Sequence, residues 1–467
     1  MNEIRFGTDG WRAIIGREFT FANLSRIVEG TATWLLEKYT HPKVMIGYDC
    51  RFMAAQFAEA TAQHLAQRGI KVYLSPSFAT TPMVSLATVQ HQCHLGIVLT
   101  ASHNPPEYLG YKLKAPYGGP APTSLLQEIE ARIPSTPLAF PDKWEELLQS
   151  RQIEIYDMEA LYQNYIKSRF DLRALAQLPY KIGFDAMYGA GQRIFPRLLP
   201  TVHPFRCEYN PSFGGINPEP IPKNLGDFSR FIQENNLDFG FVLDGDADRI
   251  GMIGKGGRYI DAHHIILLVL HYLLHYRKQR GRVIVSVSCA VRVGEYARKR
   301  GLPVEITPVG FKHIAERMQT AEDTLLGAEE SGGVAIPSHL PERDGTYIAL
   351  LLLQMLQETG KDLPALIQEI YEVVGPFAVD RLDWSLPEER KHAILRRLSV
   401  SPPTTFGGKI VTAIDHTDGY KLLLEGGEAV MFRASGTEPI LRIYTEAPTA
   451  ERARQLLTEG QELVMQA

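Results

Sequence analysis

The chain has 467 residues, of which 45% are hydrophobic and 22% charged, and its formal net charge is −4. This length exceeds what one hydrophobic core organises, so about three or four domains are expected. The composition is ordinary for a globular protein in water, and the slight negative charge argues against nucleic acid or an anionic membrane as the main partner. The four cysteines stand far apart without a CxxC pair, which favours a reduced chain over a disulfide framework or a zinc site.

No targeting or membrane-spanning segment is expected. Residues 2–12 are charged and rich in glycine, unlike a secretory signal. The longest apolar runs, 265–270 and 348–353, are too short to cross a bilayer and are predicted to be core helices. We therefore expect a cytoplasmic protein, a monomer or homodimer, that acts on small molecules and has no membrane partner.

A strand–helix–strand plan occurs three times along the chain. Each copy starts with an apolar strand that ends in a polar loop, and it returns in a second strand within about 30 residues, as in a βαβ unit. The predicted segments are 43–49, 52–68 and 70–74; 181–185, a helix opening at 189–191, and 205–209; and 282–287, 293–300 and 303–306. Because the copies are far apart, they predict three similar α/β domains in tandem rather than a solenoid.

The spacing of these copies sets the expected domain boundaries. We predict α/β domains at 1–150, 151–255 and 256–375, and a smaller α+β domain at 376–467. The amphipathic segment 144–170 is predicted to form the first crossover. The last domain is expected to contain short strands and a closing helix, at 409–414, 419–424, 429–432, 440–445 and 450–465.

A polar loop follows the apolar strand predicted at 95–98. The loop stops at Pro105 and Pro106, which continue neither a sheet nor a helix. It is expected to set Ser102 at a fixed, exposed place with His103 beside it. A Ser-His pair alone is most often an ordinary turn, so the case for a reactive hydroxyl depends on motifs further along the chain.

Three carboxylates, Asp244, Asp246 and Asp248, follow the strand predicted at 239–243. Their alternate spacing lets a looped backbone aim three oxygen ligands at one point. Two carboxylates about 4 Å apart repel by roughly 4 kcal/mol at an effective dielectric constant near 20, so converging acids need a cation or must diverge into water. Oxygen ligands favour Mg²⁺ or a similar hard ion. No Glu stands at the end of the twelve-residue loop that an EF-hand starting at Asp244 would require.

Two further loops suit a phosphorylated polyol. The stretch 433–439 can present backbone N–H groups, hydroxyls and a guanidinium to one phosphate, and a second cation follows; the candidate ligands are Arg433, Ser435, Gly436, Thr437 and Arg442. The stretch 327–333 places Glu329 and Ser331 between glycines, where they suit sugar hydroxyls, and Lys312 precedes it as another cation. Arg12, in a glycine-rich turn, is a candidate phosphate ligand. A hydroxyl, a cation site and a phosphate site together indicate phosphoryl transfer through a serine.

Taken in order, these motifs resemble those of the α-D-phosphohexomutase family, which includes phosphoglucomutases and phosphomannomutases. The resemblance runs nearly end to end, and the motifs that carry it are Gly-Thr-Asp-Gly-Trp-Arg at 7–12, Thr-Ala-Ser-His-Asn-Pro at 100–105, Asp-Gly-Asp-Ala-Asp-Arg at 244–249, Glu-Glu-Ser-Gly at 329–332 and Arg-Ala-Ser-Gly-Thr-Glu-Pro at 433–439. It implies three related α/β/α domains with mixed sheets and a different α+β fourth domain around a central cleft.

The resemblance also implies roles for single residues. Ser102 would be carried as phosphoserine, and Mg²⁺, held by the three aspartates, would also touch its phosphate. Glu329 and Ser331 would bind sugar hydroxyls, and the 433–437 loop would bind the phosphate that is not being transferred. Residues near the reacting phosphoryl group would be Arg12, His103, Lys112 and Arg249, with Lys112 or a neighbour as general acid/base. Leu109 departs from the family pattern, because many members have Asn there.

The implied reaction interconverts hexose 1-phosphate and hexose 6-phosphate through a hexose 1,6-bisphosphate, which also acts as activator. The loop pattern leans towards glucose, with mannose as a second substrate, and phosphoglucosamine mutase is the alternative. A less favoured alternative is a metal-dependent sugar-phosphate phosphatase or phosphotransferase. Such an enzyme needs no second phosphate-binding site, so the phosphate-binding loop expected at 433–437 argues against it. A catalytically inactive sugar-phosphate binder would not need Ser102, the aspartates and Lys112 together.

Overall fold

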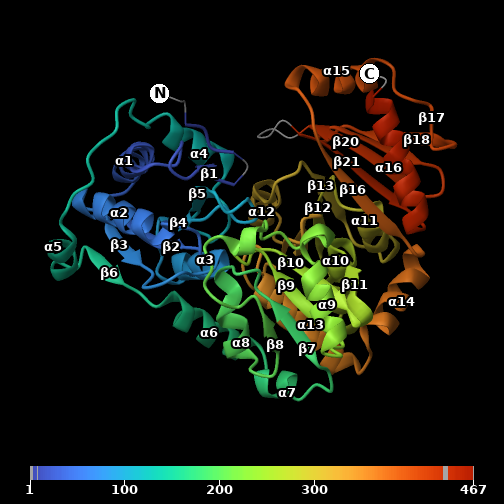
Figure 1. The fold of residues 1–467 in the computed structure, drawn as a ribbon, viewed down its shortest axis with the longest axis horizontal. Helices are drawn as coiled ribbons and strands as arrows, with labels where there is room; N and C mark the ends of the chain where they lie inside the picture. The colour runs from blue at the N-terminus through green and yellow to red at the C-terminus, as the bar shows by residue number, and fades with distance from the viewer. Residues whose placement is uncertain (1–3, 8, 435–439, 466–467) are drawn as a thin grey trace. The chain divides into compact units, whose positions relative to one another are not determined.

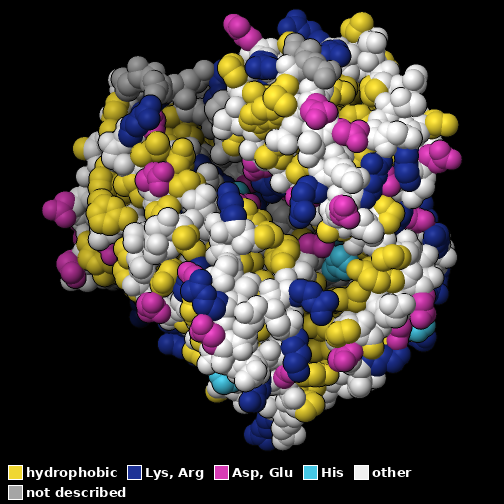
Figure 2. All heavy atoms as spheres, turned by 45° about the vertical axis from the view of Figure 1, so that its right-hand side comes forward, with side chains coloured by type: hydrophobic (Ala, Val, Ile, Leu, Met, Phe, Trp, Pro, Cys, Tyr) yellow, Lys and Arg dark blue, Asp and Glu magenta, His cyan; other side chains and the backbone are white. Residues whose placement is uncertain are grey.

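The structure is a computed structural model that describes residues 4–7, 9–434 and 440–465. The chain divides into two compact units, Met1–Ile265 with Ser331–Gly360, and Ile266–Glu330 with Lys361–Ala467. Within the described ranges, no helix is both long enough and apolar enough to cross a membrane. On the face drawn in Figure 2, the described Lys and Arg side chains are interspersed with Asp and Glu and do not gather into one basic surface.

The first sheet of the first unit has six strands in the order β1-β5-β4-β2-β3-β6 (Figure 1). Its strands are β1 (Trp11–Ile14), β2 (Lys43–Tyr48), β3 (Lys71–Leu74), β4 (Leu95–Leu99), β5 (Tyr108–Lys114) and β6 (Ile153–Ile155). The helices of this region are α1 (Phe21–Lys38), α2 (Ala54–Gln67), α3 (Thr81–Gln90), α4 (Thr123–Glu130) and α5 (Trp144–Gln149). The strands β2, β3, β4 and β6 are parallel, whereas β1 and β5 run antiparallel to their neighbours. The predicted first strand–helix–strand copy and the strand at 95–98 are therefore confirmed.

The segment 144–170, predicted to form the first crossover, contains three elements. They are α5, the edge strand β6 and a second helix, α6 (Met158–Arg169). Arg151 adopts a left-handed backbone (φ 57°), which ends the helical path after α5. The β6 strand then pairs in parallel with β3, and the Asp157 side chain caps α6 by accepting from the Ala160 N–H.

The second sheet of the first unit has the order β11-β10-β9-β7-β8. Its strands are β7 (Ile182–Asp185), β8 (His203–Phe205), β9 (Phe239–Leu243), β10 (Ile250–Gly254) and β11 (Arg258–Ile260). The helices are α7 (Leu172–Ala176), η1 (Ala190–Gln192), α8 (Ile194–Leu198), η2 (Phe213–Gly215), η3 (Pro222–Asn224), α9 (Gly226–Glu234) and η4 (Lys255–Gly257). The return strand predicted at 205–209 lies earlier, because Arg206 turns left-handed (φ 46°) and pairs with Asp185 at the end of β7.

A later part of the chain also belongs to the first unit. It comprises β15 (Val334–Ala335) and α13 (Gly345–Thr359), and α13 lies against β9 and β10 (orange beside green in Figure 1). Asp344 caps α13 by accepting from the Tyr347 N–H, and Gly360 ends it in a left-handed conformation (φ 65°). The residues just before this helix, Glu342 and Arg343, are thereby carried into the first unit.

In the second unit, β12 (Arg282–Ser286) lies between β13 (Val304–Thr307) and β14 (Thr324–Ala328) and is parallel to both. The third predicted copy is therefore confirmed. The helices that follow or precede these strands are α10 (Ala262–His271), the π-helical turn η5 (Tyr272–Tyr276), α11 (Val291–Lys299), α12 (Phe311–Thr320) and α14 (Leu363–Val374). The predicted core helices at 265–270 and 348–353 lie within α10 and α13.

The last sheet is antiparallel, with the order β16-β21-β20-β19-β18-β17. Its strands are β16 (Ala378–Ser385), β17 (Thr405–Phe406), β18 (Lys409–Asp415), β19 (Tyr420–Leu424), β20 (Glu428–Ala434) and β21 (Ile440–Ala447), accompanied by α15 (Glu388–Val400) and α16 (Ala450–Met465). The four predicted strands and the closing helix are confirmed. The sequence pattern missed β16, β17 and α15. In β16 every residue keeps part of its surface exposed, so no apolar face marks the strand.

Candidate active site

Two loops that leave neighbouring sheets meet at Ser102. The serine follows β4, and the Ser102 Oγ donates to the Asp244 Oδ2 at 2.7 Å, directly after β9. The His103 Nδ1 lies 3.3 Å from the same Oγ. Ser102 is not exposed as predicted: only 1% of its surface is accessible, because the aspartate loop covers it.

Gly245 allows this close approach. A Cβ at Gly245 would collide with the Ser102 carbonyl oxygen, so no larger residue fits without moving one of the loops. Ser102 itself adopts a left-handed backbone (φ 50°), which is uncommon outside glycine. Such a conformation persists only when its surroundings hold it in place, and it is typical of functional sites.

The three aspartates form a buried carboxylate cluster. Asp244, Asp246 and Asp248 each offer an oxygen within 4.8 Å of the others. The Oδ1 atoms of Asp246 and Asp248 are buried and accept no hydrogen bond in the described part of the chain. Burial, and then the charges of the other two carboxylates, raise the pKa of Asp244 well above its usual range. Buried oxygens without donors fit a hard divalent cation, which would compensate their charge.

Lys112 contacts this cluster through the other oxygens, the Oδ2 atoms of Asp246 and Asp248. It lies on β5, and its Nζ contacts the Oδ2 atoms of Asp246 and Asp248 at 3.1 and 2.8 Å and that of Asp9 at 2.7 Å. Burial acts to lower the pKa of Lys112, but these three carboxylates raise it above its ordinary value. Lys112 is therefore held as a cation among three acids.

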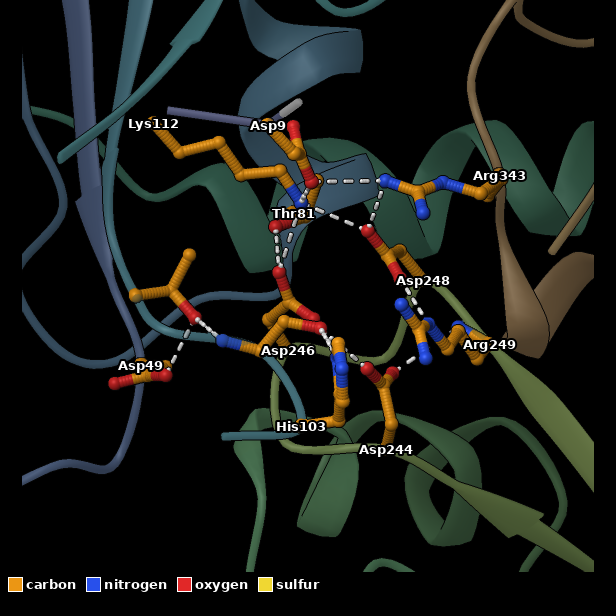
Figure 3. A network of polar contacts seen from close by, with 12 residues as sticks. Asp9, Asp49, Thr81, His103, Lys112, Asp244, Asp246, Asp248, Arg249 and Arg343 are labelled. Carbon is orange, nitrogen blue, oxygen red and sulfur yellow. Dashed lines mark hydrogen bonds and ion pairs between the residues drawn. The ribbon is translucent and has the colours of Figure 1, made fainter. Parts of the chain in front are cut away.

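Figure 3 shows a second cation in the same network, which the sequence analysis missed. The Arg343 Nη2 lies 2.7 Å from the Asp248 Oδ2 and 3.1 Å from the Asp9 Oδ2. The sequence gives only one weak signal for Arg343, namely its place in a charged run before an apolar helix. Nothing in the local pattern connects this run with the aspartate loop.

A second missed contact comes from Thr81, at the start of α3. Its Oγ1 donates to the Asp246 Oδ2 at 2.6 Å. Burial acts to raise the pKa of Asp246, but Lys112 and this hydroxyl outweigh it and hold the pKa below the ordinary value. The carboxylate is therefore kept ionised by its partners.

A buried arginine beneath the serine loop was also missed. Arg51 donates to four backbone carbonyls of this loop, those of Ser102, Asn104 and Pro105 at 2.7 Å and that of Tyr108 at 2.9 Å. Its own counter-ion is Asp49, at 3.2 Å, which also accepts from the Thr100 hydroxyl. Burial raises the pKa of Asp49 to about 6. The guanidinium ties the start and the end of the loop to one point.

The other predicted residues of the first unit lie around this network. The Arg12 Nη1 donates to the Asn104 Oδ1 at 2.6 Å, and its Nη2 lies 3.6 Å from Asp9. The Arg249 backbone N–H donates to Asp244 at 3.0 Å, and its side chain lies 3.9 Å from Asp248 and from Glu219. Leu109, the departure from the family pattern, is fully buried in the hydrophobic core of the first sheet.

The second unit holds most of the predicted substrate ligands. Arg433 lies on β20, opposite Arg442 on β21, so two cations share one end of the sheet. The Asp418 Oδ2 fixes Arg433 by accepting from its Nε at 2.8 Å, and it also accepts from the Val309 N–H at 3.1 Å. Arg442 pairs with Asp383 at 3.7 Å. Ser435, Gly436 and Thr437 lie outside the described residues.

The predicted sugar loop begins where β14 ends. Glu329 is buried, with 5% of its surface exposed, and the adjacent Glu330 accepts from the Ser286 and Ser288 hydroxyls. Ser331 follows as the first residue of the second segment of the first unit. Lys312 lies in the first turn of α12 and remains partly exposed.

Comparison with known proteins finds matches to one family along nearly the whole chain. Family models of phosphoglucomutase/phosphomannomutase match residues 3–139, 160–257 and 261–374 as the alpha/beta/alpha domains I, II and III, and residues 385–460 as the C-terminal domain. A phosphoglucomutase/phosphomannomutase of Thermococcus kodakarensis is 31% identical over 99% of this chain and 98% of its own length.

Two further relatives widen the range of named substrates. A phosphoglucosamine mutase of Caldicellulosiruptor bescii is 28% identical over 96% of each chain. The crystal structure of a Thermus thermophilus protein that is assigned as a phosphomannomutase superposes with a TM-score of 0.88 at 37% identity, covering 99% of both chains. With four family domains in order and three α/β/α domains followed by a different fourth one, the chain belongs to the phosphoglucomutase/phosphomannomutase family and is a phosphohexomutase, an intramolecular phosphotransferase.

Proposed function

We propose that this enzyme interconverts hexose 1-phosphate and hexose 6-phosphate, with Ser102 as the residue that carries the phosphoryl group. The observation that carries the proposal is the contact between the Ser102 Oγ and the Asp244 Oδ2 at 2.7 Å, inside a cluster of three convergent carboxylates. A phosphoserine there adds about −1.5 to −2 charge at neutral pH. Such a site requires cations on several sides, and Lys112, Arg12 and Arg249 lie around it.

The reaction follows from the exchange of two phosphoryl groups. In the first step the bond between phosphorus and the Ser102 Oγ breaks, and a bond forms to the free hydroxyl of the sugar phosphate, giving a hexose 1,6-bisphosphate. The proton of that hydroxyl is the one that the Oγ regains, relayed through an adjacent side chain such as Lys112 or His103. In the second step the bond between the sugar and its other phosphoryl group breaks, that group forms a bond to the Ser102 Oγ, and the proton of the Oγ passes to the freed sugar oxygen.

Phosphoryl transfer depends mainly on alignment and on stabilisation of charge. We assign Asp244, Asp246 and Asp248 as ligands of Mg²⁺, with the phosphorylated Ser102 as a fourth. When bound, this ion supplies positive charge for the oxygens of the transferring group. The buried Oδ1 atoms of Asp246 and Asp248, which lack hydrogen-bond donors among the described residues, support this assignment.

The sugar phosphate itself requires separate recognition of its two ends. We assign the phosphate that is not being transferred to Arg433, Ser435, Gly436, Thr437 and Arg442, and the sugar hydroxyls to Glu329 and Ser331, with Lys312 as a further cation. The pair of cations on β20 and β21 supports the first assignment. Glucose is the proposed main substrate and mannose the second, with glucosamine phosphate as the alternative that the phosphoglucosamine mutase relatives favour.

The test is a set of coupled assays on the 1-phosphates of glucose, mannose and glucosamine, with Mg²⁺ and a trace of the matching bisphosphate. We expect the 6-phosphate as product, phosphate on Ser102 by mass spectrometry, and loss of turnover in Ser102→Ala and in EDTA. Release of inorganic phosphate in place of the 6-phosphate would indicate a phosphatase. Unchanged turnover in Ser102→Ala would exclude the phosphoserine route.

A further inference from the structure

We propose that Thr81 is a positioning residue of the cation site: its hydroxyl turns Asp246 so that one carboxylate oxygen is reserved for the metal. The inference rests on the proposed function of the aspartates, and it concerns a residue outside the aspartate loop. Thr81 and Asp246 are 165 residues apart in the chain. Thr81 is fully buried, so its hydroxyl has no access to solvent.

Two contacts join Thr81 to Asp246. The Thr81 Oγ1 donates to the Oδ2 at 2.6 Å, and the Thr81 N–H donates to the Asp246 backbone carbonyl at 2.9 Å. The start of α3 therefore holds both the main chain and the side chain of this aspartate. The helix itself is fixed by Thr80, whose hydroxyl accepts from the Met83 N–H.

The two oxygens of Asp246 have different surroundings as a result. The Oδ2 accepts from Thr81 and lies 3.1 Å from the Lys112 Nζ, whereas the Oδ1 is buried and accepts from no described group. A threonine hydroxyl has one proton to donate, and here it is committed to the Oδ2. Figure 3 shows Thr81 and Lys112 on the same side of the carboxylate. Rotation of the carboxylate would break both contacts.

The consequence is that the carboxylate oxygen available to the metal is held in one orientation. Partners that orient metal-binding carboxylates affect metal affinity although they do not touch the metal, and their removal typically costs about 10–100-fold. Without the Thr81 hydroxyl, the Oδ2 keeps only Lys112, and the carboxylate can rotate towards that cation. We therefore expect weaker metal binding with little change in fold.

The test uses a matched set of variants. Thr81→Val removes the hydroxyl at nearly constant shape, and Thr81→Ser retains it. Thr88→Val, on the same helix, removes a buried hydroxyl that donates to the Val84 carbonyl at 2.7 Å and serves as the control for stability. Mn²⁺, which prefers the same oxygen ligands as Mg²⁺, is titrated into each metal-free protein without substrate, and free Mn²⁺ is measured by electron paramagnetic resonance.

We expect the Kd for Mn²⁺ to rise at least about 10-fold in Thr81→Val. We expect wild-type values in Thr81→Ser and Thr88→Val, and the same order in the Mg²⁺ concentration that half-saturates mutase activity. Equal Mn²⁺ affinity in Thr81→Val and wild type, with mutase activity present in both, would overturn the inference and leave the proposed function intact. A wild-type protein that neither binds Mn²⁺ nor acts as a mutase would instead contradict the proposed function.

Discussion

Replacement of Arg51 by lysine tests whether the serine loop is held from beneath. The guanidinium donates to four carbonyls between Ser102 and Tyr108. A lysine side chain is shorter and has a single ammonium group in place of the planar guanidinium, so it can donate to one or two of them. A buried acceptor that loses its partner costs about 1–3 kcal/mol. With two or three carbonyls affected, Arg51→Lys is expected to lower the free energy of unfolding by about 3–5 kcal/mol.

The same change is expected to reduce turnover beyond its effect on stability. If the loop relaxes, the Ser102 Oγ moves relative to the aspartates, and a misplacement of about 1 Å at a reacting group can cost roughly 100-fold in rate. Unfolding in urea and kcat at 25 °C, where the variant remains folded, separate the two effects. We expect kcat to fall at least about 10-fold.

Arg26→Lys is the matched control for this experiment. Arg26 is also buried in the first unit and donates to the Pro134 carbonyl at 2.7 Å, away from the serine loop. It should lose stability and retain kcat. A wild-type kcat in Arg51→Lys, or an equal loss in Arg26→Lys, would refute the view that Arg51 positions Ser102.

Three further predictions concern other parts of the chain. Gly245→Ala should lower kcat at least about 10-fold, because the new Cβ meets the Ser102 carbonyl; Gly226→Ala, where no atom lies within 4 Å, should leave kcat unchanged. Asp418→Asn should raise KM for the sugar phosphate about 10-fold with little change in kcat, since Arg433 loses its charged partner; unchanged KM would contradict this. Asp261→Asn tests pH dependence: burial acts to raise the pKa of Asp261, but His264 lowers it from 3.8 to about 2. A carboxyl pKa that is lower in the folded state stabilises the protein above pH 4 by about 2 kcal/mol. The difference in free energy of unfolding between wild type and Asp261→Asn, measured by urea titration, should therefore shrink as the pH falls from 4 to 2. A pH-independent difference would contradict the assignment.

The sequence pattern located most strands because their burial is a local property. The strand β4 is buried along its whole length and stands out as an apolar run. Where no apolar pattern exists, as in the half-exposed β16, prediction failed.

The motifs of the candidate site could be predicted from the sequence, but the contacts between them could not. The serine and aspartate loops could be named from residue types and spacing, and the structure brings them together. Their roles in catalysis remain predictions. Thr81 and Arg343 were not predicted, because the sequence around a buried threonine or arginine does not show which residue it contacts. Their contacts with Asp246 and Asp248 depend on the packing of segments that are far apart in sequence.

The return of residues 331–360 to the first unit has a consequence for biosynthesis. On the ribosome, Asp9, Lys112 and the aspartate loop emerge long before Arg343, so the nascent first unit must carry incompletely balanced acids until α13 is made. A fragment that stops at residue 265 would lack Arg343 and the helix that covers β9 and β10. The network around the aspartates is thus expected to be completed late in translation, after the whole of the second unit's first segment, residues 266–330, has left the exit tunnel.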